Sequence, residues 1–303
     1  MNPAVVMGLR APQPFLKRRL ITRSLVVAGA VTLSACSLLQ TIYEQAPRYV
    51  QWRTNVAHHF TDDQYERAQT AIGRWFDWQR SEQMPRVSEL LRQAAIDARG
   101  PVSPALACER RQAYLEVAKA GIASATPLAA SVIVHLGPEQ ARRVQAFFDD
   151  LNDDYREKYL ADDADEQARR AVAFIEQWGS LVYGDFTPAQ RASLAREVQA
   201  LPFNARTLLV EFQRFQGRYV QLLHDTQAQK LSAAQVSQRL QAMLLDGIDP
   251  QEPVRKAQMQ RWVQAGCALA SSLQAQTTPA QRERASRTLM GWQDDVIEIA
   301  SSR

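Results

Sequence analysis

The sequence predicts an all-α protein of about ten antiparallel helices, arranged as an elongated bundle or an irregular helical array. Three observations lead to this fold class. Apolar residues recur at steps of three and four along several segments, which places them on one face of a helix. Stretches containing proline or glycine separate those segments at short intervals. No segment alternates apolar and polar residues convincingly, as a strand would.

Residues 1–35 have the composition of an export signal. A basic stretch at 17–23 precedes a mostly apolar run at 24–35, which is too short to span a bilayer. The run ends in Leu33-Ser-Ala-Cys36, which resembles the lipobox of bacterial lipoproteins, where the cysteine is acylated and becomes the first residue of the mature chain. We therefore predict a signal peptide over 1–35 and lipid attachment at Cys36. A structural cysteine after an ordinary signal or a short anchor helix is the alternative.

Two details bear on the destination of the chain. Arg18-Arg19 faintly resembles a twin-arginine export signal, but the pair lies in a generally basic region, which favours the general secretory route. Ser37 follows the cysteine where an aspartate would retain the protein in the inner membrane under the enteric-type sorting rule. Several acyl chains, at ~0.8 kcal/mol per buried CH₂, would hold the chain durably. We expect it on the periplasmic side of the outer membrane, with membrane contact through acyl chains on Cys36.

Charge argues against nucleic acid as a partner. The chain has 36 basic and 32 acidic residues. Five of the basic residues and none of the acidic ones lie in 1–35, which leaves 31 against 32 in the mature chain. The basic surface that nucleic-acid binding requires is therefore not expected.

Residues 36–303 are long enough for one elongated domain or for two lobes with a break near 161–166. Apolar faces predict helices over 138–160, over 204–225 and near the end of the chain. The positions that form these faces are Val144, Phe148, Leu151, Tyr155 and Tyr159; Leu208, Phe212, Phe215, Tyr219 and Leu222; and Trp262, Gly266, Leu269 and Leu273.

Helix breakers divide the mature chain. They are Pro85, residues 100–104, Pro127, Gly137-Pro138, residues 162–165, Pro188, Pro202 and residues 247–250. The most apolar run, 117–136, contains Lys119, Pro127 and many alanines. We expect this run to form a buried helical hairpin rather than a membrane span.

A pentapeptide recurs at predicted helix starts: an apolar residue in most copies, then Thr, Ser or Gly, two further residues, and Gln. Its copies begin at Phe60, Leu136, Phe186, Leu231 and Thr277, and the last four begin 50, 45 and 46 residues apart. This is the pattern of a capping box, in which a hydroxyl and a glutamine satisfy amides at the helix start. The candidate cap or binding residues are Thr61, Gln64, Gln140, Thr187, Gln190, Ser232, Gln235, Thr278 and Gln281.

Two resemblances accompany these residues. The pentapeptide resembles the Leu-Thr-x-x-Gln motif of small helical periplasmic chaperones and envelope stress regulators, although capping alone explains it. The segments 60–64, 75–86, 136–140, 152–156 and 183–190, with Tyr43 and Trp52, resemble a family of helical bacterial lipoproteins catalogued as a domain of unknown function. In that family the tryptophan segment usually carries His and Leu where this chain has Gln79 and Met84. The resemblance implies fold and location, and no activity.

The sequence predicts no catalytic residues, no metal site and no cofactor. Its four histidines lack metal-ligand spacing, and His58-His59 before a helix start is expected in a solvated turn. The acidic residues at 149–157 are expected on a solvated helix face. The tryptophans at 75, 78, 178, 262 and 292 fit a helical core better than a sugar groove.

Cys108 and Cys267 form an even pair in a compartment that oxidises thiols. They either form one disulfide or remain two buried small residues in helices.

These observations predict a non-enzymatic binding, scaffold or chaperone-like module that contacts an envelope protein or an unfolded client. The alternative is an enzyme that acts on peptidoglycan, although the Glu-Ser dipeptide typical of lytic enzymes is absent from the chain.

Overall fold

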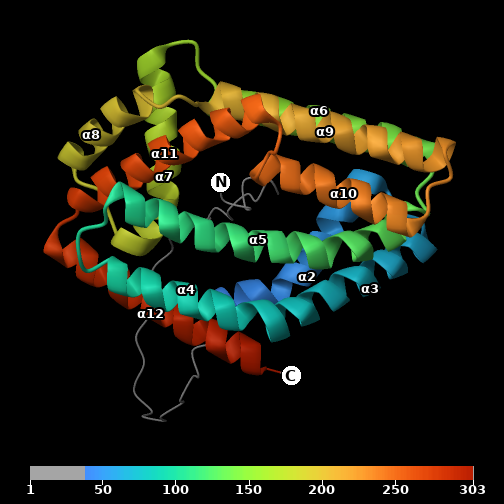
Figure 1. Cartoon of the computed structure of the whole chain (residues 1–303), viewed down its shortest axis with the longest axis horizontal. Coiled ribbons are helices and arrows are strands. Elements are labelled where there is room, and N and C mark those ends of the chain that lie inside the picture. Colours follow the sequence, from blue (N-terminus) through green and yellow to red (C-terminus); the bar gives the residue numbers. More distant parts are fainter. Residues whose placement is uncertain (1–37, 303) are drawn as a thin grey trace, which may run out of the picture.

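The structure is a computed structural model that describes residues 38–302 (Figure 1). These residues form helices joined by short turns and contain no strand, which confirms the predicted all-α fold. The predicted signal peptide and Cys36 lie outside the described residues.

The helices follow one another with connections of a few residues. They are α2 (Leu38–His58), α3 (Asp62–Trp78), α4 (Met84–Asp97), α5 (Pro104–Ile133), α6 (Pro138–Tyr159), α7 (Ala164–Tyr183), α8 (Pro188–Gln199), α9 (Ala205–Ala228), α10 (Ala233–Ile248), α11 (Pro253–Ala275) and α12 (Pro279–Ser301). A π-helical turn, Gln79–Gln83, joins α3 to α4.

Figure 1 shows α5 crossing the middle of the molecule, with α10 and the α6–α9 pair above it and α4 and α12 below it. Helices α7, α8 and part of α11 gather at one end. Helices that follow the turn at 160–163 pack on helices that precede it: α9 on α6, α10 on α5, and α12 on α4.

The largest apolar core lies among α5, α6, α9 and α10. Its buried residues include Ile133, Val144, Leu222, Val236 and Leu240. A second cluster lies between α7 and α8, and a third joins the start of α2 to α4 and the end of α12. The apolar faces predicted for α6 and α9 pack toward one another in the first of these cores, where Phe148 and Tyr219 are in ring contact.

The prediction that Pro127 ends a helix is wrong. Helix α5 runs unbroken through Pro127, so residues 117–136 do not form a hairpin. Proline inside a helix costs about 3 kcal/mol or more, because it has no N–H to donate and its ring clashes with the carbonyl four residues earlier. Leu115 is buried before Pro127, and Ala130 and Ile133 are buried after it. Burial on both sides favours the continuous helix over a break. Within residues 38–302, no helix is both long and apolar enough to cross a membrane.

Pro85 also fails to separate two helices by a loop. The backbone N–H of Met84 donates to the carbonyl of Gln79, five residues earlier, and this π-helical turn leads directly into α4. Pro85 then occupies the first turn of α4, a position that tolerates proline.

Candidate functional site

All five copies of the repeated motif begin a helix, which confirms the capping interpretation. The hydroxyls of Thr61, Thr187, Ser232 and Thr278 accept hydrogen bonds from the backbone N–H three residues later, at 3.2 to 3.4 Å. In all five copies the glutamine Oε1 accepts from the backbone N–H of the cap residue, at 2.7 to 3.1 Å. Gly137 has no hydroxyl, so its helix α6 retains only this second half of the box.

The structure also brings four of these glutamines together in two pairs. Gln64 Nε2 donates to Gln140 Oε1 at 3.2 Å, and Gln140 Nε2 donates to Gln64 Oε1 at 2.7 Å. Gln190 Nε2 donates to Gln281 Oε1 at 2.8 Å, and Gln281 Nε2 donates back at 3.2 Å. The starts of α3 and α6, and those of α8 and α12, therefore meet through reciprocal amide bonds.

The second Nε2 hydrogen of each paired glutamine reaches a backbone carbonyl beside the partner helix. The acceptors are His135 for Gln64, His59 for Gln140, Gln276 for Gln190, and Asp185 for Gln281, at 2.6 to 3.4 Å. Each acceptor lies two positions before the cap residue of the partner helix. The two pairs therefore have the same contact pattern, and within each pair the pattern is reciprocal.

These contacts decide whether the motif is open to a partner. The four paired glutamines are only 4 to 9% exposed, and their amide groups donate and accept within the fold. A buried amide with this complement of hydrogen bonds has little capacity left for an external ligand. Gln235 differs, because it is exposed and its hydrogen bonds close its own box with Ser232. The motif therefore caps a helix in all five copies, and in four of them its glutamine also joins two helices.

Sequence reasoning missed the pairing. The members of each pair lie 76 and 91 residues apart, so no local pattern links them. One signal was available: a buried glutamine needs partners for both amide atoms, and its own capping box uses only Oε1. A repeated box after an apolar residue therefore implied an additional acceptor for each Nε2.

Cys108 on α5 and Cys267 on α11 form a disulfide, with the Cα atoms 5.4 Å apart. This resolves the choice that the sequence left open. The bridge closes a loop across 159 positions and joins helices from the two halves of the chain.

The prediction of a solvated turn holds for His59 and is wrong for His58. His59 is exposed, with a φ of 50°. His58 is the last residue of α2 and is buried beside Phe60 and Tyr219. Its Nδ1–H donates to the carbonyl of Thr54 at 2.8 Å, and its Nε2 accepts from the Tyr219 hydroxyl at 3.0 Å. Burial lowers the pKa of His58 and raises that of Tyr219, which favours the neutral form of both.

The acidic residues of α6 lie on a solvated helix face, as the sequence predicts. The carboxylates at 149, 150, 153, 154 and 157 are exposed on α6, and Asp153 pairs with Arg156 at 2.6 Å. Among the tryptophans considered for a groove, Trp262 is buried and the other four are half-buried. Within residues 38–302, no three His, Cys, Asp or Glu side chains gather as a metal-ligand group.

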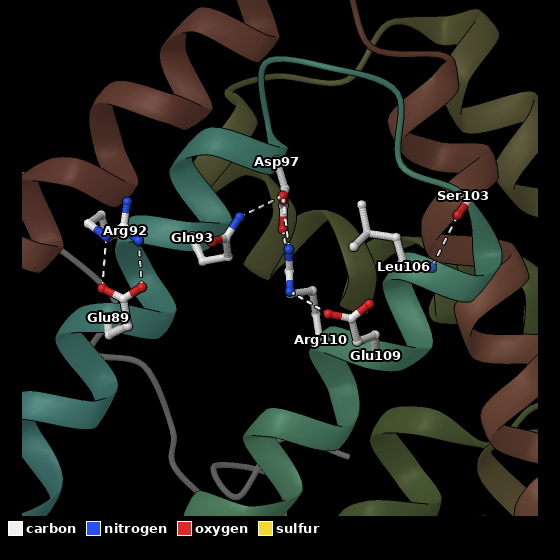
Figure 2. A network of polar contacts seen from close by, with 8 residues as sticks. All are labelled: Glu89, Arg92, Gln93, Asp97, Ser103, Leu106, Glu109 and Arg110. Atoms are coloured by element: carbon white, nitrogen blue, oxygen red, sulfur yellow. Dashed lines mark hydrogen bonds and ion pairs between the residues drawn. The ribbon is translucent and has the colours of Figure 1, made fainter.

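Helices α4 and α5 are fastened together at the ends that flank the loop 98–103 (Figure 2). Asp97, at the end of α4, accepts from Arg110 Nε on α5 at 2.6 Å and from Gln93 at 3.2 Å. Partial burial opposes ionisation of Asp97, but the hydrogen bonds from Arg110 and Gln93 hold its pKa below the ordinary value. Ser103 caps the start of α5 by accepting from Leu106 N. These contacts hold the end of α4 against the start of α5.

Helix α11 contacts the loop between α4 and α5. Gln274 Nε2 donates to the carbonyls of Ala98 and Gly100, and the Ser271 hydroxyl donates to that of Val102. The Tyr183 hydroxyl in turn donates to Gln274 Oε1 at 2.7 Å. With the disulfide, these bonds make the loop 98–103 a rigid joint among α4, α5, α7 and α11.

Away from this joint, α4 and α5 leave an open cleft of about 500 Å³ between them. Pro85, Leu90, Ala113 and Val117 supply an apolar lining, and Arg86, Glu89 and Glu116 supply charged groups. Glu89 pairs with Arg92 and Glu116 pairs with Lys119, so both carboxylates have a cation beside them. An apolar cleft with charged groups around it is suited to an uncharged segment that carries apolar side chains.

Comparison with known proteins gives no further assignment. No protein-family model, curated protein or solved structure matches the chain. The resemblance to helical lipoproteins of unknown function therefore remains a prediction.

Proposed function

We propose that the protein is an outer-membrane lipoprotein whose helical domain binds apolar segments of other envelope proteins in the α4–α5 cleft. Acyl chains on Cys36 hold the domain on the periplasmic side of the membrane. Support for the anchor comes from the sequence: a basic stretch, a short apolar run and a lipobox-like tetrapeptide in the right order. Support for binding comes from the cleft.

The observation that carries the binding proposal is the combination of an open apolar cleft and a rigid joint. The Asp97–Arg110 pair and the contacts of Gln274 fix the angle between α4 and α5 on one side of the cleft. Leu90 and Val117, which line it, are only half-buried, so their side chains have apolar surface to offer a ligand. The cleft is open rather than enclosed, so a client segment would lie along it with one side still facing solvent. The cleft can take a few apolar side chains of a client without reordering the helices.

Aggregation of an unfolded client tests this proposal. The purified mature domain should slow light scattering by a reduced, unfolded secreted protein. Leu90→Glu and Val117→Glu place a carboxylate in the cleft and should remove most of this effect. Val210→Glu is the matched control, because Val210 is an exposed apolar residue on a different helix, α9. Melting curves establish that all three variants are folded.

Equal protection by the cleft variants and the control would exclude the cleft as the binding site. A parallel digestion of purified peptidoglycan addresses the rival function. Release of soluble cell-wall fragments by the domain would favour the enzyme instead of the binding module.

A further inference from the structure

Helix α2 has an unpartnered apolar stripe on one flank. The stripe consists of Ile42, Tyr49, Trp52 and Val56, which fall within about 80° of the helix circumference at roughly 100° per residue. Ile42 and Trp52 are each 55% exposed, and Val56 is 37% exposed. The rings of Tyr49 and Trp52 are in contact, with centroids 5.7 Å apart. Of the polar residues on α2, only Gln45 lies within the same sector.

The helix that carries this stripe begins only a few residues after the predicted lipid anchor, Cys36. Leu39 and Tyr43, in the first turns of α2, pack against Met84, Val296 and Ile299. Gln40 also donates a hydrogen bond to Glu298 on α12. Three residue steps separate the Cα of Leu39 from that of Cys36, a reach of about 11 Å at most. If Cys36 is acylated, the start of α2 therefore cannot leave the bilayer surface by more than this distance.

The chemistry of the stripe matches the boundary between lipid and water. Tryptophan and tyrosine are enriched at the headgroup level of membranes, where one part of the ring system is apolar and another is wet. Arg48 and Arg53 lie on either side of the stripe, and arginine side chains can reach lipid phosphates from there. The Arg53 guanidinium lies 5.8 Å from the centroid of the Trp52 ring and 4.9 Å from that of Phe147 on α6. This contact keeps a cation beside the exposed indole.

We propose that the stripe lies in the headgroup region of the bilayer that holds the acyl chains of Cys36, with α2 parallel to the membrane surface. This inference rests on the lipid anchor of the proposed function. The tether supplies an effective concentration of about millimolar, so the stripe needs only weak affinity for lipid to remain in contact. Helix α2 then fixes the orientation of the whole domain and not only its location.

Quenching of Trp52 fluorescence by brominated lipid tests the proposal. The chain from Cys36 onward is coupled through the Cys36 thiol to a maleimide lipid in vesicles of phosphatidylethanolamine and phosphatidylglycerol. Cys108 and Cys267 do not react, because they are bridged. Three proteins are compared: the unsubstituted chain, Trp52→Phe, and Trp52→Phe combined with Val210→Trp. The last carries a matched tryptophan, because Val210 is 53% exposed on α9.

We expect brominated lipid to quench the unsubstituted chain well beyond Trp52→Phe, with a blue shift of the Trp52 emission on coupling. The Val210→Trp protein should show no quenching beyond Trp52→Phe. Equal quenching of all three proteins would overturn the proposal. A concentration-dependent blue shift of Trp52 without vesicles would also overturn it, because a second copy of the chain would then cover the stripe.

The coupled lipid makes this test independent of natural acylation. If Cys36 is not acylated in the cell, the native chain will be missing from the membrane fraction, which is a separate observation. Failure of the binding function appears in the client assay, which uses the domain without vesicles.

Discussion

Gln190 and Gln281 exchange hydrogen bonds at 2.8 and 3.2 Å although 91 positions separate them in the sequence. Each glutamine also completes the capping box of its own helix and donates to a carbonyl beside the other. Each glutamine side chain therefore caps the start of its own helix and also positions that helix against the other one. The pair of Gln64 and Gln140 does the same for α3 and α6.

The first prediction concerns the stability that the reciprocal hydrogen bonds between Gln190 and Gln281 contribute. Gln190→Ala and Gln281→Ala should each lower the free energy of unfolding by about 1 to 3 kcal/mol, because each leaves a buried amide short of partners. The double variant should cost less than the sum, with a coupling energy of about 0.5 to 3 kcal/mol from a double-mutant cycle. Urea unfolding measures all four proteins. Gln235→Ala is the control, since exposed Gln235 closes only its own box and should cost less. Strict additivity would show that the exchange contributes nothing.

The second prediction separates capping from recognition at Thr187. Thr187→Ala should lower the free energy of unfolding by roughly 0.5 to 2 kcal/mol, because Gln190 N loses its acceptor. Thr187→Asp should restore most of this stability and leave client binding unchanged, since a carboxylate also accepts from that amide. Melting curves and the client assay are made on both variants. A stable Asp variant that no longer binds clients would contradict the assignment of this motif to the fold.

The third prediction is a loss of stability in mild acid. His58 has a lowered pKa in the folded protein because it is buried, while in the unfolded chain it titrates near 6.5. Below pH 6.5 the unfolded state binds a proton that the folded state does not, so the free energy of unfolding falls with falling pH. Above pH 6.5 this contribution is fully present. Urea unfolding at pH 7.5 and pH 5.5 measures the difference.

Two substitutions identify the group responsible. His58→Phe should reduce the difference between the two pH values, whatever its effect on absolute stability. His59→Asn should retain the difference, because His59 is exposed and asparagine accepts a positive φ readily. An unchanged pH dependence in His58→Phe would assign the effect to another group.

The fourth prediction concerns the disulfide. Replacing Cys108 and Cys267 together by alanine should lower the free energy of unfolding by about 5 kcal/mol in the chain-entropy model, because the bridge restricts a long loop in the unfolded chain. Alkylation of unfolded, non-reduced protein from the periplasm, followed by mass spectrometry, counts free thiols. Detection of both thiols in free form would show that the bridge does not form in the cell.

Much of the fold follows from local patterns in the sequence. The capping boxes mark the starts of α3, α6, α8, α10 and α12, because a hydroxyl and a glutamine three residues apart act within a single helix turn. The glycine and proline at 137 and 138 also separate α5 from α6, as predicted.

Tertiary contacts decided the remaining features. Pro127 lies within α5, where burial on both sides outweighs a lost hydrogen bond. His58 is buried because Tyr219, 161 positions later, offers its hydroxyl. The α4–α5 cleft depends on the Asp97–Arg110 pair and on contacts of Gln274 from α11. None of these relationships leaves a periodic trace in the sequence, so none could be predicted from it.

The proposed function requires that Cys36 anchor this domain to the outer membrane, so the decisive measurement is lipid attachment at that residue. The full chain and its Cys36→Ser variant are expressed in a diderm bacterium, the membranes are fractionated, and the amino-terminal peptide is weighed by mass spectrometry. We predict that the mature chain begins at Cys36, carries acyl groups there and sediments with the outer membrane. The Cys36→Ser variant should retain residues 1–35 or appear as a soluble species. Outer-membrane partitioning that is unchanged in Cys36→Ser would show that Cys36 is not the anchor.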